Sequence, residues 1–257
     1  MSTLELGLIG NCAISALIDG VGRIAWCCLP RFDGDPFFSS LLANEEQAAA
    51  RGYWSVEIDR FASAEQHYEH NTAILVTRLT DADGASLEIR DYCPRFRNHD
   101  RMFHPTMIVR QIRAVTGSPK VRVRIRPTND YGSGRPAVTR GSNHIRYVCP
   151  DLTMRLTTDA AVSYLLDETW FLLDQPVTML LGPDESLTAS LSETARNFEE
   201  RTARYWQDWS RALSIPFEWQ DAVIRAAITL KLSTYEETGA IVAAMTTSVP
   251  EAAGTER

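Results

Sequence analysis

Apolar residues alternate with polar ones along most of the chain, in short runs separated by turn sequences. Four pairs of such runs flank a turn: 14–18 with 23–28, 73–80 with 85–92, 106–115 with 120–126, and 138–140 with 144–148. Runs of this kind around Gly, Asp or Pro residues predict β-hairpins. Further strand-like segments at 54–58, 152–157 and 177–181 complete the pattern. Regular short strands without intervening helices predict antiparallel sheets packed face to face.

The period changes to that of a helix after Pro183. Ser190 and Glu193 form a capping-box pattern. Apolar and aromatic residues then recur at spacings of three and four, namely Phe198, Thr202, Tyr205, Trp206, Trp209 and Leu213. Pro216 predicts a break. A second helix is expected to carry one apolar side made of Trp219, Val223, Ala226, Ala227, Leu230 and Thr234. Gly239 is expected to cap its C-terminus.

These patterns divide the chain into three parts. We expect a β-sandwich domain at residues 1–185, a linker helix at 186–214, and the beginning of a helical domain at 215–257. A pair of helices cannot bury an apolar face alone. Because the sequence reaches Arg257 soon after this helix, we expect the chemistry of the helical domain to lie outside the chain.

Composition narrows the class of protein. The chain has 257 residues, 44% of them hydrophobic and 23% charged, as in an ordinary soluble protein. The net charge of −7 argues against nucleic-acid and anionic-membrane partners. No apolar run approaches the ~20 residues of a membrane span, and the N-terminus lacks a signal-peptide pattern. Five irregularly spaced cysteines indicate reduced thiols and a cytoplasmic protein.

The common catalytic and cofactor motifs do not occur in the sequence. It contains no Gly-x-Ser-x-Gly, no Walker A loop, no Gly-x-Gly-x-x-Gly and no His-Glu-x-x-His. The cysteines and histidines lack the spacing of a zinc site. We therefore expect no catalytic residue, no metal and no cofactor in this chain.

Arginines alternate with aliphatic residues near the middle of the chain. Arg122, Arg124 and Arg126 would share one face of a strand. Arg110 and Arg113 are expected on the neighbouring strand, where an even and an odd position point to opposite faces, so they do not both join that face. One interpretation is an anion site or a face on which another domain docks. The other, which we favour, is a solvated sheet face, because antiparallel sheets commonly expose one side.

The segment 26–38 combines charge and aromatic rings after a buried strand. Arg31, Asp33 and Asp35 are interleaved with three phenylalanines, Phe32, Phe37 and Phe38. Such a loop can grip sugar hydroxyls through bidentate hydrogen bonds and ring stacking. The alternative is a loop held by an Arg–Asp pair, with its phenylalanines in the core.

At this loop the sequence resembles a known family. Residues 8–12, 16–18 and 22–33 look like the opening of bacterial and archaeal glycoside hydrolase family 15 proteins, the glucoamylase, glucodextranase and trehalase-like group. Further similar segments are 89–94, 126–132 and 205–210. The strongest match comprises residues 226–235, 238–244 and 246–251. Asn11 and Cys28 are small departures from the family's pattern.

The resemblance implies a mainly β fold, an antiparallel β-supersandwich followed by a linker helix and the first helix of a truncated (α/α)6 catalytic barrel. It also implies that the sugar-gripping Arg–Asp pair and the two catalytic glutamates follow the position matching Arg257. Inverting hydrolysis needs two carboxyls roughly 6.5–9.5 Å apart. Acidic pairs within the chain, such as Glu236 with Glu237 or Asp33 with Asp35, have no support as substitutes.

We therefore expect the non-catalytic N-terminal domain of an α-glucoside hydrolase, whose partners are its own catalytic barrel and an α-glucoside or oligosaccharide substrate. It would brace the barrel and border the active-site mouth. The expected substrate-binding residues are Arg31, Phe32, Asp33, Thr247, Ser248 and Glu251.

Two alternatives stay open. One is a stand-alone carbohydrate-binding or protein-interaction module without hydrolysis. The other concerns assembly, because Trp219, Val223, Ala226 and Leu230 would face water on the barrel helix. An exposed apolar patch of this kind favours a homo-oligomer.

Overall fold

The computed structural model describes residues 5–43 and 50–249. Strands dominate, and each pair of strands is antiparallel. One sheet has the order β1-β2-β3-β5-β12-β16, with β4 on the end of β3. Its strands are β1 (Gly7–Gly10), β2 (Ser15–Ile18), β3 (Ile24–Leu29), β4 (Asp35–Ser39), β5 (Tyr53–Ile58), β12 (Lys120–Arg126) and β16 (Phe171–Leu172).

The second large sheet has the order β13-β14-β15-β17-β11-β8-β7-β6. Its strands are β6 (Phe61–Tyr68), β7 (Leu75–Asp81), β8 (Ser86–Tyr92), β11 (Ile108–Thr116), β13 (Ala137–Arg140), β14 (His144–Val148), β15 (Thr153–Thr158) and β17 (Val177–Pro183). A small hairpin joins β9 (Phe96–Asn98) to β10 (Arg101–Phe103). The remaining elements are η1 (Ser40–Leu42), α2 (Val162–Leu166), α3 (Leu191–Arg211) and α4 (Gln220–Leu232). The predicted antiparallel sandwich followed by helices is confirmed.

The main core lies between the two large sheets, because alternate residues of each strand point inward. Trp54, Val56 and Ile58 of β5 are buried there, together with Leu79 and Leu87 of the opposite sheet. The alternating apolar residues of β5 therefore point into the space between the sheets, as its sequence predicts.

A buried ion pair joins the two sheets within this core. Arg110 and Asp91 are both 0% exposed, and two hydrogen bonds of 2.7 and 2.9 Å join them. Arg110 also donates to the carbonyl oxygens of Trp54 (3.0 Å) and Gly22 (2.7 Å) in the other sheet. Gly22 has φ +79°, and a Cβ there would lie 3.0 Å from Ile89 Cδ1. Only glycine suits this close approach.

The predicted hairpin between 106–115 and 120–126 is wrong. β11 pairs with β17 and β8, whereas β12 pairs with β5 and β16 in the other sheet. The turn around Gly117 (φ +65°) therefore carries the chain from one sheet to the other. Arg110 and Arg113 consequently do not neighbour the arginines of β12. Val109 is buried on the outer side of β11 and Ile112 on the inner side, which suits a central strand covered on both faces.

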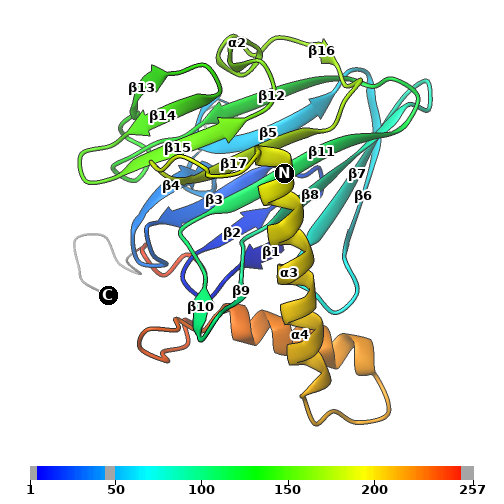
Figure 1. The fold of residues 1–257 in the computed structure, drawn as a ribbon, viewed down its shortest axis with the longest axis vertical. Helices are drawn as coiled ribbons and strands as arrows, with labels where there is room; N and C mark the ends of the chain where they lie inside the picture. Colours follow the sequence, from blue (N-terminus) through cyan, green and yellow to red (C-terminus); the bar gives the residue numbers. More distant parts are fainter. Residues whose placement is uncertain (1–4, 44–49, 250–257) are drawn as a thin grey trace.

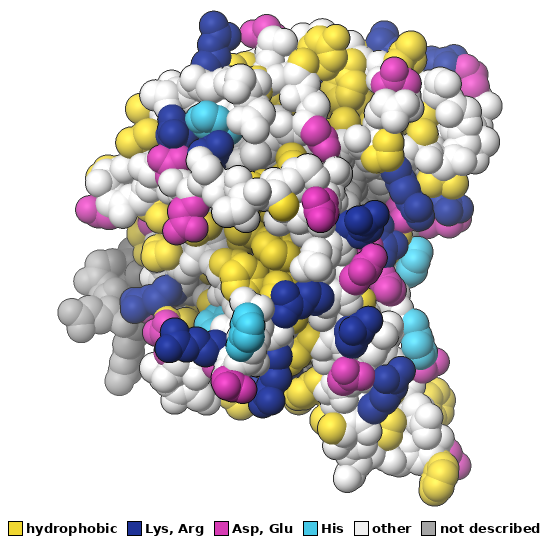
Figure 2. Space-filling view, in the orientation of Figure 1, with side chains coloured by type: hydrophobic (Ala, Val, Ile, Leu, Met, Phe, Trp, Pro, Cys, Tyr) yellow, Lys and Arg dark blue, Asp and Glu magenta, His cyan; other side chains and the backbone are white. Residues whose placement is uncertain are grey.

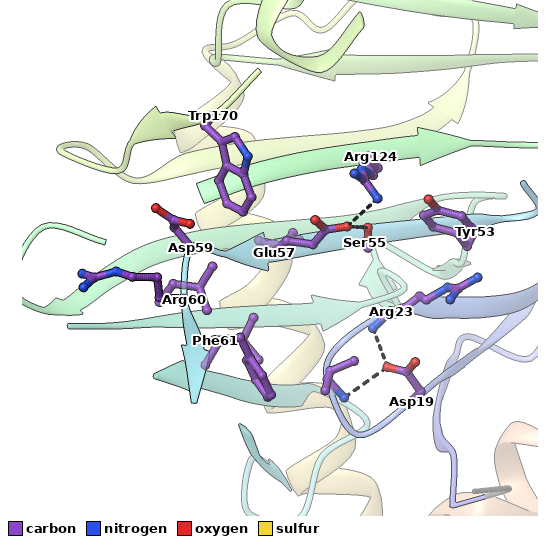
Figure 3. Close-up of a pocket in the computed structure, with 14 residues that line it drawn as sticks. Asp19, Arg23, Tyr53, Ser55, Glu57, Asp59, Arg60, Phe61, Arg124 and Trp170 are labelled. Carbon is purple, nitrogen blue, oxygen red and sulfur yellow. Dashed lines mark hydrogen bonds and ion pairs between the residues drawn. The ribbon is translucent and has the colours of Figure 1, made fainter. Parts of the chain in front are cut away.

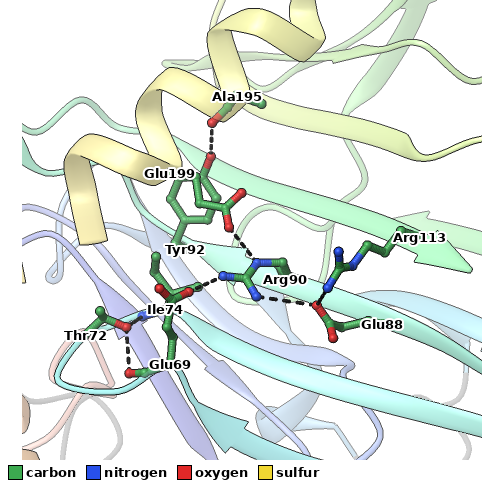
Figure 4. A network of polar contacts seen from close by, with 9 residues as sticks. All are labelled: Glu69, Thr72, Ile74, Glu88, Arg90, Tyr92, Arg113, Ala195 and Glu199. Carbon is green, nitrogen blue, oxygen red and sulfur yellow. Dashed lines mark hydrogen bonds and ion pairs between the residues drawn. The ribbon is translucent and has the colours of Figure 1, made fainter. Parts of the chain in front are cut away.

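Helix α3 crosses the outer face of the eight-stranded sheet (Figure 1). Ser190 caps it by accepting the backbone N–H of Glu193 at 3.3 Å, as the capping box predicts. A polar network ties the helix to β8 (Figure 4). Tyr92 donates to the carbonyl of Ala195 at 2.7 Å, and Arg90 donates to Glu199 at 2.6 Å. Arg90 also pairs with Glu69 in the β6–β7 turn.

Helix α4 lies across one end of the sandwich (Figure 1). Ile224, Ile228 and Leu232 are buried at a spacing of four residues. They pack in a second core that contains Leu8 and Trp206. The predicted cap at Gly239 is wrong, because the helix ends at Leu232. Gly239 instead closes a separate turn, with φ +72° and a 2.8 Å bond from its N–H to the Tyr235 carbonyl.

Basic and acidic side chains are interspersed over the face shown in Figure 2. Hydrophobic side chains reach the surface at the lower tip, where α3 and α4 meet. Phe217 and Trp219 in this region are 98% and 80% exposed. Among the described residues, no helix combines the length and apolar character needed to cross a bilayer.

Candidate functional site

Three segments of the chain meet beyond the C-terminal end of β3. They are the loop 30–34, the loop 127–134 and the segment 245–249, and we call their meeting place the rim. The loop after β3 turns tightly, with a 3.0 Å bond from Gly34 N–H to the Arg31 carbonyl. A Cβ at Gly34 would lie 2.4 Å from the Leu29 carbonyl oxygen, so this turn requires glycine.

Arg31 and Asp33 form a bidentate pair at the surface of the rim. Arg31 Nε and Nη2 each donate to one oxygen of Asp33 at 3.0 Å. The hydrogen bond and charge of Asp33 raise the pKa of Arg31. Both side chains are more than half exposed, so the pair contributes little to stability. It does hold the guanidinium and the carboxylate in one plane, where both remain accessible from solvent.

Phe32 points away from solvent. Its side chain is 4% exposed and meets the Tyr235 ring edge to face, with 6.0 Å between centroids. Tyr235 follows α4 and donates to Glu237 at 2.8 Å. Phe32 therefore holds the rim loop against the segment that follows α4. This agrees with the second interpretation of the loop, in which its phenylalanines point inward.

Asp35 shapes the neighbouring loop. Its two oxygens accept the backbone N–H groups of Asp130 at 2.6 Å and Tyr131 at 2.8 Å. Both donor residues, Asp130 and Tyr131, have positive φ, 50° and 51°, which is uncommon outside glycine. The carboxylate of Asp35 thus stabilises a backbone conformation of higher energy.

The segment 245–249 is tied to β3 and to this loop. Trp26 Nε1 donates to the Met245 carbonyl at 2.8 Å, and Tyr131 donates to the Ser248 carbonyl at 3.1 Å. Ser248 Oγ lies 3.2 Å from Cys28 Sγ. Burial raises the pKa of the Cys28 thiol to about 11, so it is protonated at neutral pH and is a poor nucleophile.

The expected site residues thus have different settings. Arg31, Asp33 and Thr247 are exposed, Ser248 is half-buried, and Phe32 is buried. Glu251 lies outside the described residues. Cys28 links Ser248 to β3 and Tyr131 links it to the loop 127–134, and the sequence did not predict either residue as part of the site. The sequence feature that could have identified Tyr131 is its place in the segment 126–132, which resembles the family.

A cavity of about 580 Å³ adjoins the rim. Asp35 and Tyr131 line one side of it, and Cys149 and Asp151 line another. Its volume lies within the usual range of small-molecule pockets, ~300–1,000 Å³. The rim therefore offers hydroxyl, carboxylate and amide groups around a space of ligand size.

Three carboxylates near the rim are already engaged. Asp33 binds Arg31, Asp35 binds two backbone N–H groups, and Glu236 pairs with Arg95. This arrangement suits binding and positioning rather than the acid and base of a hydrolase. No group of three or more His, Cys, Asp or Glu side chains in the described part of the chain is arranged to hold a metal ion.

Arg95 connects the β-sandwich to both helices. Its side chain is 1% exposed, donates to the Asn11 carbonyl at 2.8 Å and pairs with Glu236 after α4. Its guanidinium carbon lies 4.9 Å from the centre of the Tyr205 ring on α3. One buried cation therefore holds three segments that are distant in sequence.

The arginines of β12 pair with two glutamates of the chain. Arg122 and Arg124 pair with Glu57, at 2.6 and 3.2 Å, and Arg126 pairs with Glu168 at 2.6 Å. Because three arginines contact two carboxylates at short range, most of their charge is offset locally. This favours the interpretation as a solvated sheet face over that as an anion site.

Comparison with known proteins assigns the family. The family model described as trehalase-like, N-terminal, matches residues 3–168. The chain belongs to the trehalase-like N-terminal domain family. The matched range covers most of both sheets and includes the rim loops 30–34 and 127–134.

Curated relatives extend the similarity to almost the whole chain. A trehalase of Thermoplasma volcanium is 25% identical over 98% of this chain and 40% of its own length. A trehalase of Mycolicibacterium smegmatis is 27% identical, and trehalase 1 of Sulfolobus acidocaldarius 29%, each over 98% of this chain and 41% of the relative. The chain thus spans about two fifths of the length of these relatives. No solved structure matches significantly.

Proposed function

We propose that this chain is the non-catalytic N-terminal part of an α-glucoside hydrolase of the trehalase type. Its β-sandwich braces a helical catalytic barrel that begins with α4, and its rim borders the mouth of the active site. The family match and the named trehalase relatives support this class of substrate.

The two faces of α4 are the observation that carries the proposal. One apolar face, formed by Ile224, Ile228 and Leu232, is buried against the sandwich. Leu230, on the other side, is 63% exposed, and Trp219, the residue just before the helix, is 80% exposed. A helix that is apolar on both sides is typical of one buried between two layers. The second layer would be the remaining helices of the barrel.

The rim is the proposed border of the mouth because its loops lie directly beside the segment that follows α4. Arg31 and Asp33 would bind sugar hydroxyls through their exposed fork, and Thr247 and Ser248 through their hydroxyls. Glu251 remains a proposal from the family resemblance. Phe32 and Tyr131 would position these loops, since their contacts join them to the α4 side.

Hydrolysis would depend on residues in the three fifths of the relatives that this chain does not match. The test is a panel of trehalose, maltotriose and isomaltose offered to the 257-residue chain and to the longer polypeptide of its reading frame. We expect glucose release from the longer polypeptide alone.

The double variant Arg31→Ala with Asp33→Ala, in the longer polypeptide, should raise KM more than it lowers kcat. The double variant Arg211→Ala with Asp208→Ala, at an exposed pair near the C-terminus of α3, is the matched control. Glucose release by the 257-residue chain at enzyme-like rates would contradict the proposal. A reading frame that ends at Arg257 would instead favour the stand-alone module.

A further inference from the structure

A second cavity lies on the other end of the seven-stranded sheet, with a volume of about 480 Å³ (Figure 3). Residues before β3 line it, whereas residues after β3 line the rim cavity. β3 has six residues, which span about 20 Å at ~3.3 Å each. A disaccharide at the rim therefore cannot reach this cavity, and the two are separate sites.

Two aromatic rings form opposite walls of this cavity. Trp170 points into it from above and Phe61 from below, with Glu57 and Asp59 between them (Figure 3). Phe61 is 50% exposed, although it is a large apolar side chain. Arg122 packs 4.4 Å from the centre of the Trp170 ring and so fixes the indole. Half-exposed rings held in place in a cleft are surfaces on which the C–H face of a sugar ring can pack.

The charges around the cavity are balanced. Three carboxylates, on Asp19, Glu57 and Asp59, and three guanidinium groups, on Arg23, Arg60 and Arg124, belong to the residues that line it. Arg60 also pairs with Asp83 outside the lining. A phosphate or an ammonium ligand would disturb this balance, whereas a neutral ligand would not. The cavity therefore favours a neutral ligand with many hydroxyl groups.

The polar groups differ in their spare capacity for hydrogen bonds. Glu57 pairs with Arg122 and Arg124, so its oxygens are already occupied and its side chain is held in place. Asp59 Oδ2 is 3.7 Å from Lys120 Nζ, which exceeds hydrogen-bond length. A carboxylate offers about four acceptor positions, so Asp59 retains capacity for sugar hydroxyls.

We propose that this cavity is a second, non-catalytic sugar-binding site that takes one neutral hexose ring of an α-glucoside. Trp170 and Phe61 pack on the ring, and Asp59 accepts hydrogen bonds from its hydroxyls. The identity of the sugar as an α-glucoside rests on the proposed function, but the location of the site does not. Binding here would tether a longer oligosaccharide to the β-sandwich at a distance from the rim.

The test is calorimetric titration of the full 257-residue chain with trehalose and maltotriose, with cellobiose, inorganic phosphate and choline as comparison probes. We expect an α-glucoside to bind with a Kd on the order of 1 mM. Trp170→Ala should weaken binding at least tenfold and Asp59→Ala several-fold. Trp170→Phe should retain most of the affinity and controls for loss of folding, together with thermal melting curves.

Two matched controls locate the binding. Leu172→Ala removes an exposed side chain two residues from Trp170 that does not line the cavity, and should leave the Kd unchanged. Arg31→Ala alters the rim and should leave the Trp170-dependent binding unchanged.

Sugar binding that survives both Trp170→Ala and Asp59→Ala would overturn the site while leaving the α-glucoside class intact. Binding of phosphate or choline in place of sugars would overturn the ligand class of the site. Trp170-dependent binding of cellobiose but not of α-glucosides would overturn the choice of sugar. No sugar binding at tens of millimolar would overturn the site, and glucose release by the longer polypeptide would show that the proposed function stands without it.

Discussion

At the scale of single residues, buried cations hold the layers of this protein together. Arg110 joins the two sheets, and Arg95 joins the sandwich to α3 and to the segment after α4. A buried charge that loses its partner is far more costly than an exposed one. These two arginines should therefore dominate the response of the fold to single substitutions.

Arg110→Met should lower the free energy of unfolding by about 3–5 kcal/mol, because Asp91 would keep a buried charge without its partner. Burial already raises the pKa of Asp91, against the opposing charge and hydrogen bonds of Arg110. The double variant Arg110→Met with Asp91→Leu should recover part of the loss. Urea unfolding measures each value. Arg113→Met is the control and should cost about 1 kcal/mol or less, because the Arg113 side chain is 57% exposed and its buried partner Glu88 keeps its pair with Arg90. Equal costs for Arg110→Met and Arg113→Met would contradict this account.

The Arg95–Glu236 pair predicts a dependence on pH. Burial acts to raise the pKa of Glu236, but the hydrogen bond and charge of Arg95 outweigh it, so that this pKa falls below its usual 4.5. His104 and Lys231 act in the same direction as Arg95. Since the folded pKa is below the unfolded one, the stabilisation is complete above pH 4.5 and is lost as the pH falls through the folded value.

Hydrogen exchange of α4 followed from pH 6 to pH 3 should therefore show progressive loss of protection in the native chain. Glu236→Gln should remove most of that dependence, and Glu237→Gln, which alters an exposed neighbour, should retain it. If Glu236→Gln loses protection of α4 over the same pH range as the native chain, a group other than Glu236 controls the pH dependence.

The sequence contained part of this residue-scale information. An Arg–Asp pair with inward phenylalanines was one of two interpretations of the loop after β3, and Arg31, Asp33 and Phe32 adopt that arrangement. Asp35 could not be predicted to hold the loop at Tyr131, because the positive φ values there belong to residues other than glycine. The partners of Arg95 were equally invisible, since Glu236 is 141 residues away in sequence.

At the scale of elements, local patterns located many strands but not always their neighbours, and they missed β1, β4, β6 and the short strands β9, β10 and β16. The alternation of apolar residues located β7, β8, β14 and most other strands. It failed at β11 and β12, because a turn sequence does not distinguish a hairpin from a crossover between sheets. For α4, the sequence identified the side that is open to solvent, and the side buried against the sandwich was missed. Both sides are apolar, so periodicity alone could not choose between them.

The open side of α4 predicts self-association of the isolated chain. Trp219 and Leu230 are largely exposed, and burial of such side chains releases roughly 25 cal/mol for each Å² of apolar surface. We expect light scattering to find a dimer or a larger species for the 257-residue chain. Leu230→Asp with Trp219→Asp should give a monomer, and Leu172→Asp on a remote strand should not. A monomer in the native chain would contradict this prediction.

At the scale of the whole molecule, the proposed function makes this chain the binding and bracing unit of a longer hydrolase. Its two sheets enclose a buried core, several of its carboxylates are paired with arginines, and its exposed apolar surface includes one side of α4. The expected division into residues 1–185, 186–214 and 215–257 stays a prediction, as does the assignment of α4 to the catalytic barrel.

Hydrogen–deuterium exchange of residues 217–241 tests the bracing role most directly. The rates should be compared between the 257-residue chain, made monomeric by Trp219→Asp with Leu230→Asp, and the longer polypeptide of the reading frame without substitutions. The account predicts at least tenfold slower exchange for these residues in the longer polypeptide, because the remaining barrel helices would cover the open face of α4. Equal exchange rates in the two proteins, in a longer polypeptide that hydrolyses trehalose, would contradict it.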